Sequence, residues 1–488
     1  MKRYIGADLG TSALKLLLVD ETGAIEKKVT RSYCVSYPAP GWSEQSPEDW
    51  WEALRLGLRE LLSETDPETL CGIGVGGQMH GLVVLDAEDR VIRPAILWND
   101  GRTARQTEAL NRDVSRLADA TANMAFAGFT APKILWMKER EPENFAKISK
   151  LMLPKDYLNY RLTGRACTDF SDASGLLLLD VAQKKWSSVM LEICGIREEQ
   201  LPKLCESCDV VGTVLPAVAA ELGIPELPVV AGAGDNAAAA VGTGTLKAGS
   251  CNISLGTSGT VFIPYDTFAP VENHSIHNFC HANGKYHLMG CILSAASCNK
   301  WFCEDILGTG DYAAEQAGIS DGDLGRNHVY FLPYLMGERS PINDTEARGV
   351  FFGMRADTKR QDLVLSVLEG VSFAIRQNLE IAREMGVEIS RSTVCGGGAR
   401  SELWCRILSN VLNLPLDLPK TEEGPGYGGA MLAMVGTGRY ESTEACAEAL
   451  LSVRGTVEPD PEIAARYEEK YRSFCKLYPA MKNLYQEL

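Results

Sequence analysis

The chain has 488 residues, of which 45% are hydrophobic and 23% charged, a composition typical of a folded globular protein rather than a disordered one. This length exceeds what one ordinary core covers, so two or three domains are expected. The 64 acidic and 48 basic residues sum to a net charge of −16, which repels nucleic acid and anionic membranes. Any phosphate ligand must therefore be held locally, by backbone donors and a metal ion.

The N-terminus and the cysteines indicate the compartment. The opening sequence MKRYIGADLG reaches Asp8 before any long apolar run, and no stretch of about eighteen apolar residues occurs, so neither a signal peptide nor a membrane span is expected. Fifteen cysteines lie without a regular framework, which is typical of reduced thiols. We therefore expect a cytoplasmic protein with no nucleic-acid or membrane partner, and a homodimer is left open.

Two clusters of metal-ligating residue types are predicted to be structural. Cys205 and Cys208 have CxxC spacing, but no second pair follows at zinc-site spacing, so a chance occurrence in a loop is expected. Four histidines lie in a segment of strand and turn, where their rings would not converge, so packed or surface side chains are expected. These are His274, His277, His281 and His287.

The tetrapeptide LGTS occurs twice, half a chain apart, each time between two apolar runs that predict the strands of a hairpin. Glycine in the turn lets the backbone approach a ligand, and successive N–H groups with threonine and serine hydroxyls suit phosphate oxygens. Two ordinary hairpins are the alternative, but a matched pair favours internal duplication. The predicted phosphate-binding residues are Gly10, Thr11 and Ser12 in the first copy and Gly256, Thr257 and Ser258 in the second.

The residue before each copy of the motif differs. Asp8 precedes the first LGTS, whereas Ser254 precedes the second. A carboxylate can hold a metal ion or its waters. The sequence therefore predicts two phosphate loops but only one acid on the metal side, Asp8.

In the first half, a helix is predicted with Ser46 as its N-cap and Pro47 in its first position. The buried strand 70–76 follows, and it ends in Gly-Gln-Met-His-Gly. Open α/β sheets place ligands at such strand ends, so we predict that Met79 packs against the carbon face of a sugar and that His80 bonds its hydroxyls. The alternative for His80 is an ordinary core position.

Helical periodicity covers residues 107–136, with interruptions at Gly128 and Pro132. A charged cluster at Lys155 and Asp156 and an acidic turn at 168–172 follow. Both are candidates for the sugar side of a cleft, with surface ion pairs as the alternative.

A second focal point is the strand and glycine turn at 225–234, after which Asp235 and Asn236 open an alanine-rich helix. The turn fits a relaxed dinucleotide-binding pattern, but no acid lies between Asp235 and Asp266, where a ribose-binding carboxylate is required, so that alternative is rejected. Asp235 would be a reasonable helix N-cap, yet a carboxylate at a strand-end turn favours catalysis.

The second half is predicted to bind the nucleotide. A short strand at 393–395 feeds a run of three glycines before a helix, and such a loop lets backbone amides approach adenosine and phosphate. Residues 424–430 are predicted to form a further glycine loop before a helix, and Trp301 would flank the nucleotide or fill a core. The residues assigned to the nucleotide are Trp301, Gly396, Gly397, Gly398 and Ser401.

No linker or low-complexity segment separates the halves, so the boundary is placed near Thr245. Residues 1–245 are predicted to carry the sugar site and the catalytic acid, and residues 246–488 most of the nucleotide site. Helices are also expected at 361–384 and 461–477.

The motifs together predict phosphoryl transfer from a nucleotide to a small neutral acceptor. Neither a P-loop nor the HRD and DFG triplets of protein kinases occur. Such transfer needs alignment, charge neutralisation and an acid that takes the hydroxyl proton, which is the role predicted for Asp235.

The sequence resembles the xylulokinases of the FGGY carbohydrate kinase family, within the actin, sugar kinase and Hsp70 superfamily. The QMHG segment discriminates most, because glycerol kinases have a charged Arg-Glu motif there. The matching segments run through nearly the whole chain: IGADLGTSALK, WSEQSPEDWW, GGQMHG, PAILWNDGR, GFTAPKILW, LPKDYL, GAGDNAAAAVG, LGTSGTVF, FLPYLMGERSP, GGGARSE and GPGYGGA.

The resemblance implies an α/β fold of two duplicated actin-like, ribonuclease H-like domains with the active site in the cleft between them. It implies ATP-dependent phosphorylation of D-xylulose at O5, with Mg²⁺. By position, Asp235 is the expected proton acceptor, Asp8 and Asp235 are the expected metal ligands, and the sugar is expected to contact Met79, His80, Asp235 and Asn236.

Two alternatives stay open at this point. The first is a kinase for another ketose or polyol, such as L-xylulose or D-ribulose, because the sequence does not reveal which configuration of the sugar hydroxyls the enzyme accepts. The second is a non-catalytic nucleotide switch on the same fold, which the presence of Asp235 disfavours. Since each half contributes one phosphate hairpin, the halves are expected to close on the substrate.

Overall fold

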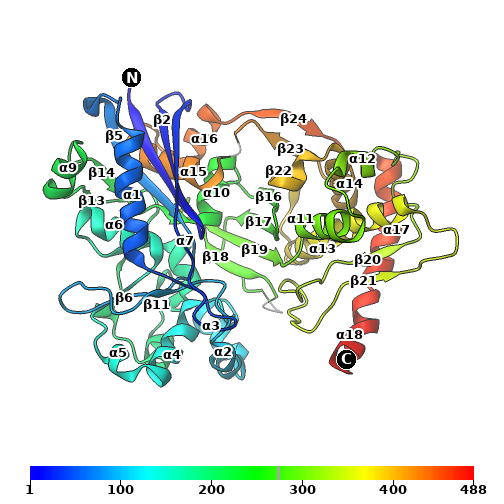
Figure 1. The fold of residues 1–488 in the computed structure, drawn as a ribbon, viewed down its shortest axis with the longest axis horizontal. Helices are drawn as coiled ribbons and strands as arrows, with labels where there is room; N and C mark the ends of the chain where they lie inside the picture. The colour runs from blue at the N-terminus through cyan, green and yellow to red at the C-terminus, as the bar shows by residue number, and fades with distance from the viewer. Residues whose placement is uncertain (272–274, 422, 488) are drawn as a thin grey trace.

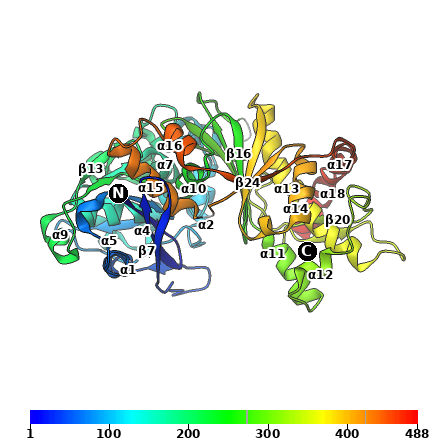
Figure 2. The same cartoon turned by 90° about the horizontal axis from the view of Figure 1, so that it is seen from above.

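The computed structural model describes residues 1–271, 275–421 and 423–487. Two halves lie side by side, each a twisted sheet with helices packed on it (Figure 1), and the view from above keeps them distinct (Figure 2). Within the described ranges, no helix combines the length and apolar character needed to cross a bilayer.

The first half is organised around a seven-stranded sheet. Its strands are β1 (Arg3–Leu9), β2 (Ala13–Asp20), β3 (Ile25–Ser32), β5 (Leu70–Gly77), β13 (Val210–Thr213), β14 (Pro228–Val230) and β15 (Ala233–Gly234). The order is β13-β14-β5-β1-β2-β3, and β15 also pairs with β5. The predicted strand at 70–76 is β5, one residue longer than expected.

The second half has a sheet of the same size. Its strands are β16 (Gly249–Leu255), β17 (Gly259–Tyr265), β18 (His277–Cys280), β19 (Tyr286–Ile292), β22 (Ile389–Cys395), β23 (Leu416–Pro419) and β24 (Val453–Val457). The order is β18-β19-β17-β16-β22-β23-β24.

The two sheets repeat one strand pattern. The run β3-β2-β1 is antiparallel, and β1, β5 and β14 are parallel. The run β19-β17-β16 is likewise antiparallel, and β16, β22 and β23 are parallel. This repeat confirms the predicted α/β class and the predicted internal duplication.

Both predicted LGTS hairpins are present, but their registers differ by one residue. In the first hairpin Leu9 pairs with Leu14, so the turn comprises residues 10–13. In the second, Leu255 pairs with Gly259, so the turn comprises residues 256–258. The second turn is therefore one residue shorter, a difference that the identical tetrapeptides did not reveal.

Helices pack on the first sheet because each has one apolar stripe. On α1 (Pro47–Leu61), the buried side chains Trp50, Leu54, Leu58 and Leu61 lie at helical spacing. Ser46 occupies the predicted N-cap position, but its side chain makes no capping hydrogen bond. The other helices on this sheet are α6 (Pro154–Thr163), α9 (Pro216–Leu222) and α10 (Asp235–Thr243).

A second layer of helices lies beside the first sheet. The predicted interruption at Pro132 was wrong, because this residue lies in the first turn of α4 (Thr130–Arg140), where its missing N–H has no partner to lose. The predicted acidic turn at 168–172 is strand β9 (Cys167–Asp169) running into α7 (Phe170–Ala173). The other helices of this layer are α2 (Ala104–Asn111), α3 (Val114–Thr121), α5 (Pro142–Ala146) and α8 (Ser188–Cys194).

In the described parts of the chain, ten short strand segments form five two-stranded sheets outside the two large ones. They are β4 (Glu44–Gln45) with β7 (Ala95–Ile96), β6 (Val83–Leu85) with β8 (Lys150–Met152), β10 (Leu179–Asp180) with β11 (Lys185–Trp186), β12 (Lys203–Cys205) with β9, and β20 (Tyr330–Leu332) with β21 (Val350–Phe352).

Helices also cover the second half. The predicted helix at 361–384 is α13 (Arg360–Glu384). The helix predicted at 461–477 is α17 (Pro461–Phe474), followed by the separate α18 (Leu477–Glu487). The other helices of this half are α11 (Ala296–Lys300), α12 (Tyr312–Gln316) and α14 (Glu402–Leu412). Helix α16 (Thr443–Leu450) packs instead on α10 of the first half.

The prediction of a glycine loop at 424–430 was wrong, because these residues form the first half of helix α15 (Gly424–Gly436). This helix packs against β1, β5 and α10 of the first half. A Cβ on Gly74 would lie 2.0 Å from the carbonyl oxygen of Gly429, and one on Gly6 would lie 1.9 Å from that of Gly426. The glycines therefore allow close helix–sheet contact rather than a turn.

The predicted packing of the histidines is confirmed for three of them, whereas the predicted loop position of the cysteine pair is wrong for Cys205. Cys205 and Cys208 are free thiols, and Cys205 lies at the end of β12 rather than in a loop. His277, His281 and His287 are buried among aromatic rings. His274 lies outside the described residues. Among those residues, no group of three or more His, Cys, Asp or Glu side chains could hold a metal ion.

Candidate active site

Asp8 and Asp235 lie at one edge of the first sheet. Asp8 on β1 is in register with Gly76 of β5, and Ala233 of β15 pairs with the same glycine. Because these strands are parallel, their carboxyl ends meet at this edge, and Asp235 follows β15 directly as the first residue of α10. The structure thus brings together the predicted metal ligand and the predicted proton acceptor.

Both carboxyl groups are difficult to ionise. Burial raises the pKa of Asp8 to about 6, an effect that Lys15 opposes and Glu423 reinforces. Burial, followed by the charge of Asp8, raises the pKa of Asp235 to about 7. Asn236 opposes this rise, since its backbone N–H and its side-chain amide donate to Asp235 Oδ1 at 2.8 and 2.9 Å. An acid with a pKa near neutrality can act as a base at physiological pH.

Three side chains hold the turn of the first hairpin. Trp98 Nε1 donates to Thr11 Oγ1 at 2.9 Å, and this hydroxyl donates in turn to Gln78 Oε1 at 3.3 Å. Gln45 Nε2 donates to the carbonyl oxygen of Thr11 at 2.6 Å. The threonine is therefore fixed on both its backbone and its side chain, while Trp98 remains 39% exposed.

Glycines on two neighbouring segments make room for Met79 and His80. A Cβ on Gly234 would lie 2.9 Å from Met79 Sδ, and one on Gly175 would lie 2.4 Å from His80 Nδ1. Gly234 directly precedes Asp235. Met79 is therefore packed against the segment that carries the predicted base, and His80 is packed against the segment of Gly175.

His80 is held in one protonation state and one tautomer. Its Nδ1 lies 2.8 Å from the carbonyl oxygen of Gly175, and because a carbonyl only accepts, Nδ1 carries the proton. Burial lowers the pKa of His80 to about 3, so the ring is neutral and Nε2 is an acceptor. The ring stacks on Phe129 with centroids 4.6 Å apart. A neutral acceptor of this kind suits a sugar hydroxyl.

The glycine run 396–398 lies against the second hairpin. Gly396 has a φ of +88°, and a Cβ there would lie 2.8 Å from the carbonyl oxygen of Leu255. A Cβ on Gly398 would lie 2.8 Å from the Leu255 side chain, whereas Gly397 has open space around it. The structure thus brings the predicted nucleotide loop next to the turn at 256–258.

Two residues assigned to the nucleotide have structural partners. Ser401 caps α14, because its hydroxyl accepts from Trp404 N at 3.1 Å and donates to Gln316 Oε1 at 2.6 Å. Trp301 is half-buried, with its ring stacked on Phe331 at a centroid distance of 6.4 Å. Nucleotide contact by these two side chains stays a prediction.

A buried charge cluster lies behind the predicted base. Lys155 Nζ is 2.7 Å from Asp156, 3.0 Å from Asp169 and 3.6 Å from Asp172. Asp169 accepts hydrogen bonds from Ser171 N at 2.9 Å and from the Ser171 and Ser207 hydroxyls. These four charges are buried, so of the two possibilities for Lys155 and the segment 168–172, surface ion pairs are excluded.

The second half reaches this region through β18. Asn123 Nδ2 donates to the carbonyl oxygen of Asn278, and Asn278 N donates back to Asn123 Oδ1, both at 2.9 Å. The ring of His277 lies 5.0 Å from that of Phe126. The junction of the halves therefore borders the predicted sugar pocket.

Models of two domains match the chain in sequence. The N-terminal domain of the FGGY family of carbohydrate kinases matches residues 3–242, and the C-terminal domain of the same family matches residues 251–437. The chain belongs to the FGGY family of carbohydrate kinases. It is therefore an enzyme that phosphorylates a carbohydrate, and ATP is the phosphoryl donor that this family implies.

Several proteins resemble this FGGY kinase over nearly its full length. It is 41% identical over 479 residues to the xylulose kinase of Escherichia coli strain K12, covering 97% of this chain and 98% of the relative. It is 39% identical to the xylulose kinase of Klebsiella pneumoniae, covering 99% of both. The solved structure of a kinase from Brucella ovis, described as a "xyloylose kinase", superposes with a TM-score of 0.94 at 40% identity, covering 99% of this chain and 100% of that one.

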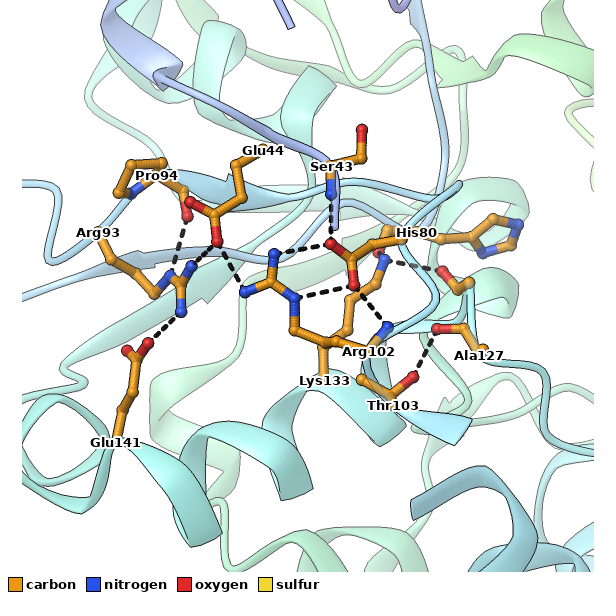
Figure 3. Close-up of polar contacts among 12 residues, drawn as sticks. Ser43, Glu44, His80, Arg93, Pro94, Arg102, Thr103, Ala127, Lys133 and Glu141 are labelled. Carbon is orange, nitrogen blue, oxygen red and sulfur yellow. Dashed lines mark hydrogen bonds and ion pairs between the residues drawn. The ribbon is translucent and has the colours of Figure 1, made fainter. Parts of the chain in front are cut away.

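A buried ion-pair network joins two loops of the first half of the FGGY kinase. Arg102 lies 2.7 Å from Glu44 (Figure 3) and 2.7 Å from Asp100, and its guanidinium lies 3.8 Å from the centre of the Trp42 ring. Asp100 also accepts from Ser43 N at 2.6 Å. The network fastens the loop before α1 to the segment that follows Trp98.

Sequence reasoning missed several supporting residues. Three of them, Gln45, Gln78 and Trp98, lie inside the segments that resemble the FGGY family. No motif or spacing assigned them a role, because their partner, Thr11, is distant in sequence. The one available signal was the position of Gln78 just after the predicted strand at 70–76.

Proposed function

We propose that this FGGY kinase transfers the γ-phosphoryl group of ATP to D-xylulose, forming D-xylulose 5-phosphate and ADP. The observation that carries the proposal is the position of Asp235, an acid with a pKa of about 7, directly after the glycine against which Met79 packs. The E. coli and K. pneumoniae relatives, both named xylulose kinases, support D-xylulose as the acceptor.

In the proposed reaction, Asp235 accepts the proton of the O5 hydroxyl as O5 forms its bond to the γ-phosphorus. The bond from that phosphorus to the ADP oxygen breaks, so one proton moves to the carboxylate and one phosphoryl group moves to the sugar. Proton transfer of this kind contributes about 10²- to 10⁴-fold to a rate. Neutral His80, Met79 and Asn236 orient the sugar without adding charge.

The residues at the strand ends fit a magnesium ion. The Asp8 carboxylate makes no hydrogen bond or ion pair with another described residue, and burial raises its pKa even though Lys15 opposes the effect. The charge of Asp8 in turn raises the pKa of Asp235, so the two acids lie close enough to interact. Carboxylate oxygens are the ligands that Mg²⁺ prefers. When bound, the ion would neutralise phosphate charge, and Asp8 and Asp235 would hold it directly or through water.

We further propose that the nucleotide lies between the two hairpins. Backbone amides of residues 10–12 and 256–258 would face its phosphates, and Gly396, Gly397 and Gly398 would face its adenosine. The open space around Gly397 supports this placement. The boundary near Thr245 divides the two roles, although α15 returns to pack on the first sheet. Closure of the halves on the substrates follows from this division.

An ADP-release assay with D-xylulose, L-xylulose, D-ribulose and glycerol tests the proposal. The highest kcat/KM is expected for D-xylulose, and NMR of the product should show phosphate on C5. A higher kcat/KM for any of the other three compounds would identify that compound as the preferred substrate in place of D-xylulose. Sugar-independent ADP release without any phosphorylated sugar would instead support a nucleotide switch.

A further inference from the structure

Lys133, the third residue after the start of α4, is a buried lysine without an ion pair among the described residues. Its Nζ lies 2.8 Å from the carbonyl oxygen of His80 and 2.8 Å from that of Gly128. Figure 3 shows the side chain extending from its helix toward His80. A buried lysine bound only to carbonyls is uncommon, since buried charges are normally paired.

The amine of Lys133 has two acceptors. Burial lowers its pKa well below the usual value, Asp100 opposes that effect and Arg102 adds to it. Both carbonyl oxygens lie within hydrogen-bond distance of Nζ, so the lysine donates to each of them.

The backbone of His80 needs external support. His80 has a φ of +67°, a left-handed conformation that costs roughly 1 kcal/mol or more in a residue with a Cβ. Its carbonyl oxygen accepts from Lys133 Nζ and also from Thr130 Oγ1 at 3.0 Å. The peptide that follows this strained residue is therefore held by two side chains of the same helix.

Residues at the beginning of α4 contact both the ring and the backbone carbonyl of His80. Phe129, at the N-cap position, stacks on the imidazole, while Thr130 and Lys133 hold the carbonyl. The second carbonyl bound by Lys133, that of Gly128, belongs to a residue in close contact with Trp98, because a Cβ on Gly128 would lie 2.2 Å from the Trp98 carbonyl oxygen.

We infer that Lys133 is a positioning residue that fixes His80 so that Nε2 meets the sugar, and that it affects the reaction only through His80. The inference rests on the proposed role of His80 in binding the sugar. Lys133 itself touches neither the sugar nor the nucleotide. Removing its amine should loosen sugar binding and leave nucleotide binding unchanged.

A double-mutant cycle between Lys133 and His80 tests this inference. Lys133→Met keeps most of the side-chain volume and removes the donor. We expect it to raise the KM for the sugar about tenfold or more with little change in the KM for ATP, since one buried hydrogen bond of about 1.4 kcal/mol corresponds to tenfold. In a His80→Ala background, the same substitution should leave the sugar KM within about twofold of that background.

Thr130→Val is the matched second variant. It removes the weaker of the two bonds to the same carbonyl, so we expect a smaller rise in the sugar KM that also disappears in the His80→Ala background. If Lys133→Met does not fold, the Thr130 cycle decides alone. An unchanged sugar KM, or an equal rise with and without His80, would overturn the inference. A wild-type enzyme that phosphorylates none of the four test sugars would contradict the proposed function instead.

Discussion

Asp8 and Asp235 lie on either side of Gly76, the residue of β5 with which Asp8 pairs directly and with which Ala233, two residues before Asp235, also pairs. The negative charge of Asp8 contributes to the raised pKa of Asp235. A group that must be ionised to accept a proton is therefore held close to its midpoint at neutral pH. The proposed metal ligand and the proposed base are therefore linked electrostatically at the sheet edge that carries both.

This coupling predicts the pH dependence of the reaction. Because Asp235 acts as a base only when deprotonated, kcat/KM should fall about tenfold per pH unit below an apparent pKa of about 7. Asp8→Asn removes a like charge and lowers the pKa of Asp235, so the acid limb should move down by roughly one unit even though the rate is lower. Raising Mg²⁺ should move the limb in the same direction. Acid limbs that coincide in the two enzymes would contradict the coupling.

The helix α15 predicts a severe effect of one methyl group. Gly74→Ala places a Cβ 2.0 Å from the carbonyl oxygen of Gly429, a backbone atom that cannot move without displacing the helix. We expect a loss of stability of about 3 kcal/mol or more, seen as a large fall in melting temperature. Gly310→Ala, at an exposed glycine with open space around it, is the control and should melt like the wild type. Equal melting temperatures for both variants would show that α15 does not pack so closely.

Buried His277 predicts a pH effect on stability. No hydrogen bond reaches either ring nitrogen from the described residues, and burial, followed by Arg339 and His80, lowers its pKa well below the usual value. The ring stays neutral when folded but is protonated below about pH 6.5 when unfolded, so the folded state loses stability as the pH falls. His277→Phe removes this term and should lose about 1.4 kcal/mol less than the wild type between pH 8 and pH 5.5. Denaturant unfolding at both pH values measures the two losses. Equal losses of unfolding free energy in the wild type and in His277→Phe would contradict this prediction.

Two aspartates of the Lys155 cluster should respond differently to the same substitution. Neither carboxylate oxygen of Asp172 makes a hydrogen bond with the described residues, and its contact with Lys155 is the longest of the cluster, at 3.6 Å. Burial and the neighbouring aspartates raise its pKa well above the usual value, so Asp172→Asn removes a carboxylate whose charge this site disfavours. We expect the free energy of unfolding to change by less than about 1 kcal/mol.

Asp169→Asn is the contrasting variant, because Asp169 is bonded to Ser171 and Ser207 and paired with Lys155. We expect this substitution to lower the free energy of unfolding by about 3 kcal/mol. It should also lower kcat, since the Ser171 hydroxyl accepts from Gly234 N at 3.2 Å, just before Asp235. Unfolding and initial-rate measurements on both variants check this, and equal stability losses would refute the distinction.

Much of the fold was predictable because it is written in local patterns. An apolar pattern next to a turn residue marks each of three features: the LGTS hairpins, the strand that ends at Gly77 and the helix that begins at Asp235. Glycine was the source of the main error. A glycine that bends the chain and a glycine that admits a neighbouring backbone both lack a Cβ, and only the tertiary packing of α15 distinguishes them.

The supporting residues of the site were less predictable than its central ones. Asp8 and Asp235 stand beside motif glycines, whereas Lys133 reaches His80 from a helix 53 residues away in sequence. The Trp98 contact to Thr11 is similar. Such residues acquire a role only from distant partners, and no spacing along the chain encodes it.

The central claim is that Asp235 is the base for the phosphorylation of D-xylulose. The most direct measurement compares wild type and Asp235→Asn for the initial rate of D-xylulose 5-phosphate formation, with ATP affinity measured by calorimetry on both. A loss of at least about 10³-fold in kcat with ATP affinity kept within about threefold is the predicted result. A variant that retains a substantial fraction of the wild-type kcat would show that another group accepts the proton.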